Sequence, residues 1–176
     1  MKLIFTIHVT HHFKRIEPIW RLYFMKIEFK SVKERQVAYV ILTGHYNQIP
    51  QFFGKLRDYI TENNIPTHGH PYCTFFNNTL NVPPEEMYYE IGIPVIGNVS
   101  GDFMIKIKKI RGHHVISTTY QGHPKYKKQL YRYIMKYTVK NGYLIAGPAT
   151  EIYINNQRDI LRNELTIELH FPVIKK

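Results

Sequence analysis

The chain of 176 residues can be laid over itself at a constant shift of 78 positions, and this internal repeat constrains its fold more than any other feature. At that shift the segment GHYNQIPQFFGKLRDYITENN, starting at Gly44, lies over GHPKYKKQLYRYIMKYTVKNG, starting at Gly122. Farther along, EIGIPVI from Glu90 lies over ELHFPVI from Glu168, and no gap is needed. Shared turn glycines and a shared Pro-Val-Ile ending indicate a duplicated unit.

The repeat predicts two units, residues 25–98 and 103–176, within one domain over residues 25–176. Each unit has two segments of alternating apolar and polar residues, a glycine turn, a segment of helical periodicity, and two further strand-like segments. Residues 1–24 lie outside the repeat. We expect them to be an added strand or helix, a dimerisation arm, or the product of a start codon upstream of Met25, and these alternatives stay open.

One helix per unit cannot cover a sheet on both faces. We therefore expect an α+β fold of tandem duplicated βαββ modules, which form a curved, mainly antiparallel sheet with two helices on one face. The helices are expected to end at Asn63 and Asn141, residues that suit C-terminal caps. This arrangement predicts a central groove between the helices, and such concave junctions are common ligand sites.

The composition is that of a folded, strongly basic protein. A hydrophobic fraction of 44% supports a core, and Cys73 is the only cysteine, which excludes intrachain disulfides. The net charge of +11 favours weak association with nucleic acid through the basic surface, although no helix-turn-helix, zinc-finger or RNA-binding pattern accompanies it. No apolar run of about 18 residues and no signal-peptide cleavage pattern is present, so we expect a cytoplasmic protein without a membrane helix.

Glu151 is the most informative single position, because it lies inside the strand-like segment TEIYI. Its counterpart 78 positions earlier is Cys73, so one half carries a carboxylate where the other half is nearly apolar. A carboxylate buried among tyrosines would suit ligand binding or the activation of a water, and a solvated strand carboxylate is the alternative. Tyr153 shares the face of Glu151 by strand alternation, and its ring is either a wall of a cation-binding pocket or part of the core.

Four further residues complete the candidate ligand-binding set. Tyr137 lies on the apolar face of the second helix, where a structural role is the alternative, and Tyr46 follows the Gly-His turn at the expected mouth of the groove. Tyr88 and its neighbour point to opposite faces of a strand, so one of the two is expected toward the groove or core. His170 lies two residues after Glu168 and faces the same way.

We expect no cofactor and no metal. The histidine-rich segment HVTHH has metal-compatible spacing, but no carboxylate accompanies it at a defining distance in the sequence. Solvated histidines are therefore the favoured interpretation.

The segment GYLIAGPATEIYINN (142–156), followed by TIELHFPVI near the chain end, resembles the GyrI-like effector-binding domain, the ligand-sensing half of multidrug-responsive transcription regulators. The segment TGHYNQIPQFFGKLRDYI is similar to the first half of the same family, so the resemblance covers about residues 25–176. It implies a duplicated βαββ fold with a deep groove that binds flat, apolar and often cationic compounds. The family's acidic residue corresponds to Glu151 and its tyrosine to Tyr153.

The resemblance also implies two roles for Glu151. In binding members the glutamate is the counter-charge for cationic ligands, whereas in a hydrolytic branch that detoxifies cyclopropane-bearing DNA alkylators it is proposed to act in water activation. The chain departs from the family where Tyr137 replaces a frequent tryptophan, and where Glu168–Pro172 replaces a frequent Glu-Ile-Tyr-Ile-Pro.

Three functions follow as hypotheses. The leading one is a small-molecule binding domain whose aromatic groove, with Glu151 at its base, holds an aromatic or cationic compound for sensing or sequestration. The second is a hydrolase of strained electrophiles that uses the same glutamate. The third is a modulator of DNA or of a DNA-acting protein.

Overall fold

The computed structural model describes residues 26–77, 81–123, 126–155 and 165–176. The N-terminal segment 1–24 and its histidines lie outside the described residues. The elements in chain order are β1 (Ile27–Val32), β2 (Arg35–Thr43), η1 (Tyr46–Gln48), α2 (Ile49–Glu62), β3 (Tyr72–Phe75), η2 (Pro84–Glu86), β4 (Tyr88–Pro94), β5 (Lys106–Ile110), β6 (His113–Gly122), α3 (Lys127–Lys140), β7 (Tyr143–Ile145), β8 (Ala149–Tyr153) and β9 (Leu165–Lys175).

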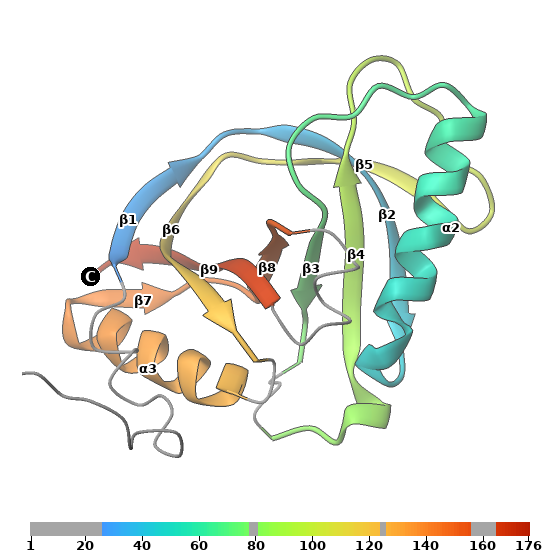
Figure 1. Ribbon diagram of the computed structural model, residues 1–176. Coiled ribbons are helices and arrows are strands. Elements are labelled where there is room, and N and C mark those ends of the chain that lie inside the picture. Colours follow the sequence, from blue (N-terminus) through green and yellow to red (C-terminus); the bar gives the residue numbers. More distant parts are fainter. Residues whose placement is uncertain (1–25, 78–80, 124–125, 156–164) are drawn as a thin grey trace, which may run out of the picture.

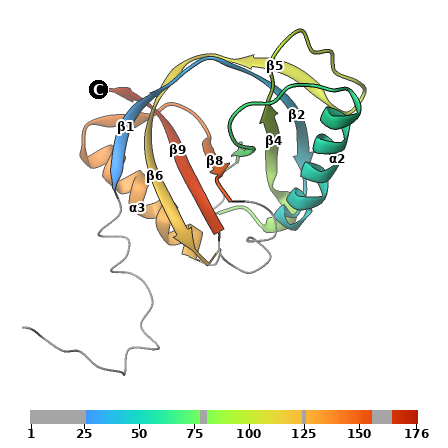
Figure 2. The same ribbon diagram turned by 45° about the horizontal axis from the view of Figure 1, so that its top comes forward.

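Within the described residues, nine strands form one antiparallel sheet in the order β1-β6-β9-β8-β3-β4-β2-β5, and β7 pairs with β9 outside this path. The sheet curls into a half-barrel, with α2 beside β2 and β4 and α3 beside β7 (Figures 1 and 2). The predicted α+β class and antiparallel sheet are confirmed.

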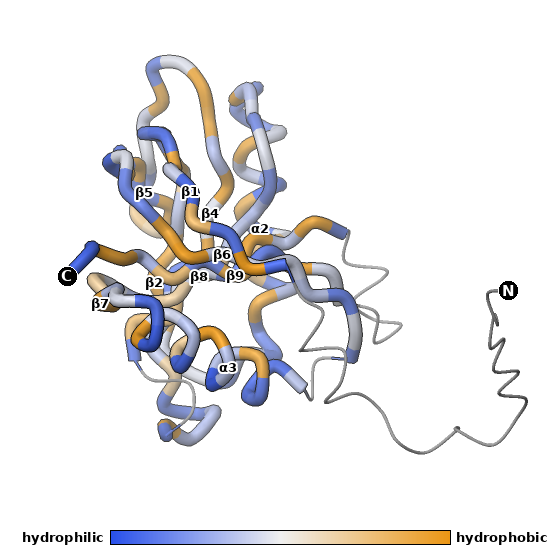
Figure 3. Tube along the Cα trace, turned by 90° about the vertical axis from the view of Figure 1, so that its left-hand side faces the viewer, coloured by the Kyte–Doolittle hydropathy of each residue, from blue (hydrophilic) through white to orange (hydrophobic). Residues whose placement is uncertain are grey.

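Both helices form where apolar residues recur once per turn. The buried positions of α2 are Ile49, Phe53, Leu56 and Ile60, and those of α3 are Leu130, Tyr131, Ile134 and Thr138. Figure 3 shows hydrophilic and hydrophobic segments alternating along α3. The helices end at Asn63 and Asn141 as predicted, and each asparagine donates from its backbone and side-chain nitrogens to a tyrosine carbonyl in the last turn.

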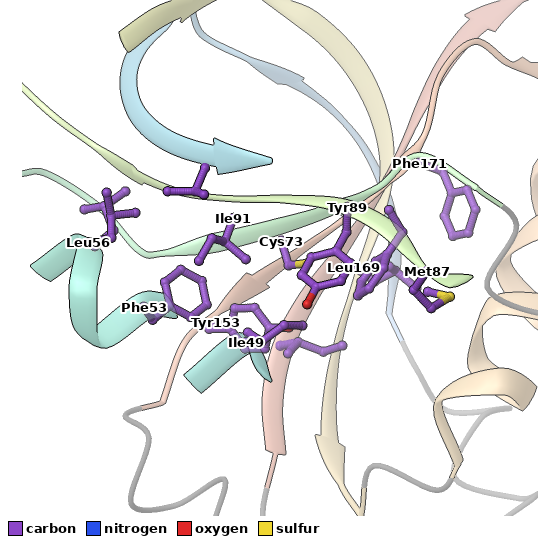
Figure 4. Packing of buried hydrophobic residues seen from close by; sticks show 14 of the residues in the cluster. Ile49, Phe53, Leu56, Cys73, Met87, Tyr89, Ile91, Tyr153, Leu169 and Phe171 are labelled. Carbon is purple, nitrogen blue, oxygen red and sulfur yellow. The ribbon is translucent and has the colours of Figure 1, made fainter. Parts of the chain in front are cut away.

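The two helices pack on the same face of the sheet. One hydrophobic core joins the buried residues of α2 and α3 to inward residues of β2, β3, β4, β6, β8 and β9. Figure 4 shows Ile49, Phe53 and Leu56 of α2 facing the strands, with Phe53 next to Tyr153. The prediction of two helices on one face is therefore confirmed, whereas the groove between them stays a prediction.

The first strand of each predicted unit pairs with the other unit. β1 pairs with β6 and β5 pairs with β2, so neither β1 nor β5 pairs with the strand that follows it in the chain. Ion pairs accompany this exchange, because Lys30 of β1 contacts Glu168 of β9 and Lys108 of β5 contacts Glu90 of β4. The two halves are thus joined by their outer strands as well as by the central pair β3–β8.

The element boundaries follow the 78-residue shift of the sequence. α3 begins at Lys127 and ends at Lys140, each 78 positions after the corresponding end of α2 at Ile49 and Glu62. The same shift separates Arg35 from His113, the first residues of β2 and β6. This spacing is what the predicted duplication requires.

Candidate functional site

The candidate site is centred on the pairing of β3 with β8 in the middle of the sheet. The register places Cys73 directly opposite Glu151, the residue that stands 78 positions after it. Because the two strands are antiparallel, a repeat related by this shift would have its twofold axis between these two residues. Both lie on the face that carries the helices, since their strand neighbours Ile91 and Leu169 belong to the helix-covered core.

Glu151 is a fully buried carboxylate with three hydrogen-bond donors. Lys127 Nζ lies 2.7 Å from it, the Tyr131 hydroxyl donates to Oε1 at 2.9 Å, and the Tyr153 hydroxyl donates to Oε2 at 3.0 Å. Lys127 and Tyr131 come from the first two turns of α3, and Tyr153 comes from the same strand as the glutamate. The burial rules out a solvated strand carboxylate, and the charge is offset by a lysine of the same chain.

The two hydroxyl donors are held in their protonated form. Burial raises the pKa of Tyr131 and of Tyr153 well above the usual value, and the nearby charge of Glu151 raises both further. Burial likewise raises the pKa of the Cys73 thiol, with the charge of Glu151 acting in the same direction. At neutral pH the tyrosines therefore donate to Glu151, and Cys73 is an uncharged neighbour with none of the thiolate character that a nucleophile needs.

Each residue of this polar set stands where the other half of the chain has an apolar residue. The counterparts at the 78-residue shift are Ile49 for Lys127, Phe53 for Tyr131, Cys73 for Glu151 and Phe75 for Tyr153. All four counterparts are buried in the same core. The second half of the chain thus supplies the polar groups of the site, and the first half has buried apolar residues at the equivalent positions.

The polar and apolar sets contact each other across the centre of the sheet. The Phe53 ring packs edge-on against Tyr153, with ring centroids 5.7 Å apart, and Lys127 Nζ lies 5.7 Å from the centroid of Phe75. An aromatic face beside a carboxylate is an arrangement that binds cations, and here it holds the ammonium of Lys127.

The other candidate residues are not among the three hydrogen-bond donors to Glu151. Tyr137 is half-buried against the helix-covered core, and Tyr46 is 52% exposed beside the ring of His45. Tyr88 is 43% exposed and faces away from the helices, where its ring lies near Phe76. Of the predicted set, the structure brings together Glu151 and Tyr153.

His170 also lies on the sheet face opposite the helices. It is buried, and its Nε2 lies 3.3 Å from Glu168 Oε1. His170 and Lys30 lower the pKa of Glu168 to about 2, against the opposite effect of partial burial. His170 therefore belongs to an ionic cluster that joins β1 to β9.

Glu90 is the counterpart of Glu168 in the first half of the chain. The Tyr72 hydroxyl donates to its Oε1 at 2.7 Å, and Lys108 Nζ is 2.5 Å from its Oε2. Each of the two glutamates that the repeat aligns, Glu90 and Glu168, is therefore paired with a lysine of the first strand of the other half.

Sequence reasoning missed Lys127 and Tyr131, the two site residues from α3. The repeat itself holds the clue: Ile49 and Phe53 belong to the apolar stripe of α2, so the residues 78 positions later, Lys127 and Tyr131, occupy the equivalent core-facing positions of α3. A lysine at such a position needs a buried partner, and Glu151 is that partner.

Within the described ranges, no group of three or more His, Cys, Asp or Glu residues is placed to hold a metal ion. The helices of those same ranges are all too short or too polar to cross a membrane.

The fold is shared with several solved structures. The EcmrR C-terminal domain superposes with a TM-score of 0.74 and 19% identity, over 87% of this chain and 99% of that one. In an EcmrR–DNA complex the TM-score is 0.77 and the identity 17%, over 89% of this chain, which spans 60% of that EcmrR chain. SAV2435 bound to tetraphenylphosphonium gives a TM-score of 0.55 and 11% identity, over 85% of this chain and 94% of that one.

At these identities the similarity shows the fold alone. In the search of curated proteins, no sequence matches the chain. The family assignment comes from the sequence, because residues 25–174 match the family described as the GyrI-like small molecule binding domain. This match covers most of the chain and includes both helices, the described strands up to residue 174 of β9, and the site around Glu151. The chain therefore belongs to the family of GyrI-like small molecule binding domains.

Proposed function

We propose that this GyrI-like domain binds aromatic or cationic small molecules between α2 and α3, with Glu151 as the counter-charge, for sensing or sequestration. One observation carries the proposal: a fully buried carboxylate lies at the centre of the sheet, among tyrosine hydroxyls and on the face that the helices cover. Membership in the family implies small-molecule binding, and Glu151 gives that binding a charged anchor.

The residues around Glu151 are suited to a ligand with an apolar body and a positive charge. Phe53 and Phe75 offer aromatic surface on the side supplied by the first half. Tyr153 offers a ring on the side of the glutamate. Burying aromatic surface drives association, and a carboxylate in a low-dielectric site fixes the orientation of a cation.

The contacts of Glu151 favour binding over water activation. Three donors already engage its two oxygens, and a reacting water would have to compete with them. A hydrolytic role would require Glu151 to take a proton from that water while it is paired with an ammonium, whereas a binding role requires only that a ligand cation take the place of the lysine.

Tetraphenylphosphonium is a suitable probe, because it is a bulky aromatic cation and is bound in the structure of SAV2435, which shares the fold. We expect the Glu151→Gln variant to bind it roughly tenfold more weakly or worse, since a charged hydrogen-bonding partner contributes about 1.5–3 kcal/mol. Triphenylphosphine oxide, an uncharged aryl phosphorus compound, should lose much less affinity. Isothermal titration calorimetry measures both.

Glu90→Gln is the matched control. Glu90 is also buried and contacted by a tyrosine and a lysine, but it lies on the opposite face of the sheet. This variant should bind tetraphenylphosphonium as the wild type does. Equal affinity of the wild type and the Glu151→Gln variant for the cation would refute the counter-charge role.

A further inference from the structure

Lys127 occupies the position that a bound cation would take. Its ammonium lies 2.7 Å from Glu151 and 5.7 Å from the centroid of the Phe75 ring, so it has both an anionic and an aromatic partner. The corresponding residue of the other half is the buried Ile49, so the helix position itself does not require a charge.

We propose that Lys127 is a resident cation of the binding site, which neutralises Glu151 in the empty protein and which a cationic ligand must displace. This inference rests on the proposed function, and it adds a residue that sets affinity and selectivity. Glu151 supplies the attraction for cations, and Lys127 competes for it from within the chain.

The buried carboxylate explains why a resident cation is needed. An ionised carboxylate taken out of water without a partner is strongly unfavourable, and a matched ammonium removes most of that cost. Tyr131 and Tyr153 donate hydrogen bonds but no positive charge. Lys127 is the cation that the structure places on Glu151.

The position of Lys127 also allows its ammonium to move away from Glu151. It is the first residue of α3, where the positive end of the helix dipole disfavours a cation, and its side chain is 26% exposed. A lysine side chain has four rotatable methylene groups, so its ammonium can reach water while the helix stays in place. A ligand cation at Glu151 would repel the ammonium and favour this movement.

The displacement of the Lys127 ammonium by a ligand cation predicts which cations bind. A small primary amine would replace one ammonium by another and gain little from Glu151. A bulky, weakly hydrated cation with aromatic groups loses less hydration on entering the site, and it also buries apolar surface against Phe53 and Phe75. We therefore expect quaternary phosphonium or ammonium compounds with aryl groups to be favoured over simple alkylamines.

The test compares Lys127→Met with Lys128→Met. Lys128 is the exposed neighbour in the same turn, so its variant removes the same charge without touching Glu151. We expect Lys127→Met to bind tetraphenylphosphonium roughly tenfold to hundredfold more tightly than the wild type, since the ligand no longer displaces a charged hydrogen-bonding partner. Lys128→Met should bind like the wild type, and triphenylphosphine oxide should show no comparable gain.

Lys127→Gln serves as a second variant, because it keeps a hydrogen-bond donor near Glu151 and lacks the charge that competes with the ligand. It should also tighten binding of the cation, and it keeps the measurement accessible where the methionine variant does not fold. Cation affinity equal to or below that of the wild type in the folded variants would overturn the role of Lys127. If Glu151→Gln binds the cation as tightly as the wild type does, or if no protein binds it, the proposed function fails as well.

Discussion

At the scale of single residues, the candidate site shows where the two halves of the predicted repeat differ in their side chains. Cys73 and Glu151 face each other on paired strands, yet one side chain is an uncharged thiol and the other a carboxylate. The charge is accommodated because Lys127 and Tyr131 replace the apolar Ile49 and Phe53 of the other helix. A buried charge of this kind requires its partners, so the four polar residues are expected to depend on one another.

His170 gives a residue-scale prediction about pH. Burial lowers its pKa below 6.5, Lys30 and Arg35 act in the same direction, and Glu168 acts against them. The folded protein therefore favours the neutral imidazole, and the stability that this contributes is present above pH 6.5 and is lost as the pH falls below it. Glu168, with its pKa lowered to about 2, stays ionised in the folded protein, so its contribution to stability is lost mainly below pH 5.

Urea denaturation at pH 7, 6 and 5 tests this prediction. The free energy of unfolding of the His170→Gln variant should fall less between pH 7 and 5 than that of the wild type. His68→Gln, which changes an exposed histidine, should keep the slope of the wild type. If the His170→Gln variant keeps the wild-type slope as well, the buried imidazole is not the source of the pH dependence.

At the scale of elements, the exchange of the outer strands joins the two halves, in addition to the central pair β3–β8. β1 and β5 lie at the two ends of the strand order, and each pairs with a strand of the other half. β5 is a lysine-rich edge, which is a common protection against pairing with other chains. One of its lysines, Lys108, also carries the ion pair with the buried Glu90.

Lys108→Met tests the energetic role of this exchange. The variant leaves Glu90 buried without its cation, and we expect it to lower the free energy of unfolding by about 2 kcal/mol, at the low side for a broken buried pair because Lys108 is partly exposed. Lys106→Met, on the same face of β5 but exposed, is the control and should change stability little. Urea denaturation at pH 7 measures both, and equal stability of the two variants would show that the ion pair contributes nothing measurable.

At the scale of the whole molecule, the sequence predicted the features that local patterns encode. Apolar spacing and asparagine caps located both helices, and alternation located the main strands. The predictions of the helices and strands succeeded because each depends on neighbours in the chain. The unmatched pair Cys73 and Glu151, found by comparing the two halves, indicated the centre of the candidate site, whose role stays a prediction.

What the sequence did not predict depends on contacts between distant segments. Alternation shows which residues share a face of a strand but not which strand lies next to it, so the pairing of β1 with β6 was not foreseen. The same limit left the orientation of Tyr88 and His170 open, and both lie on the face opposite the helices. Lys127 was missed because a lysine in the first turn of a helix is usually solvated.

The whole molecule is also strongly basic, with a net charge of +11, and the weak association with nucleic acid that this favours stays a prediction. The proposed ligand site has a different electrostatic character, because its centre is a carboxylate offset by one lysine. Our proposal therefore locates ligand recognition at Glu151 and not on the basic surface.

The most direct test of this account is a crystal structure of the protein with tetraphenylphosphonium. We predict that the phosphonium lies between α2 and α3 next to the Glu151 carboxylate, with its phenyl groups against Phe53 and Phe75, and that Lys127 Nζ has moved away from Glu151 to solvent. A phosphonium bound elsewhere, with the contact between Lys127 and Glu151 intact, would contradict the central claim.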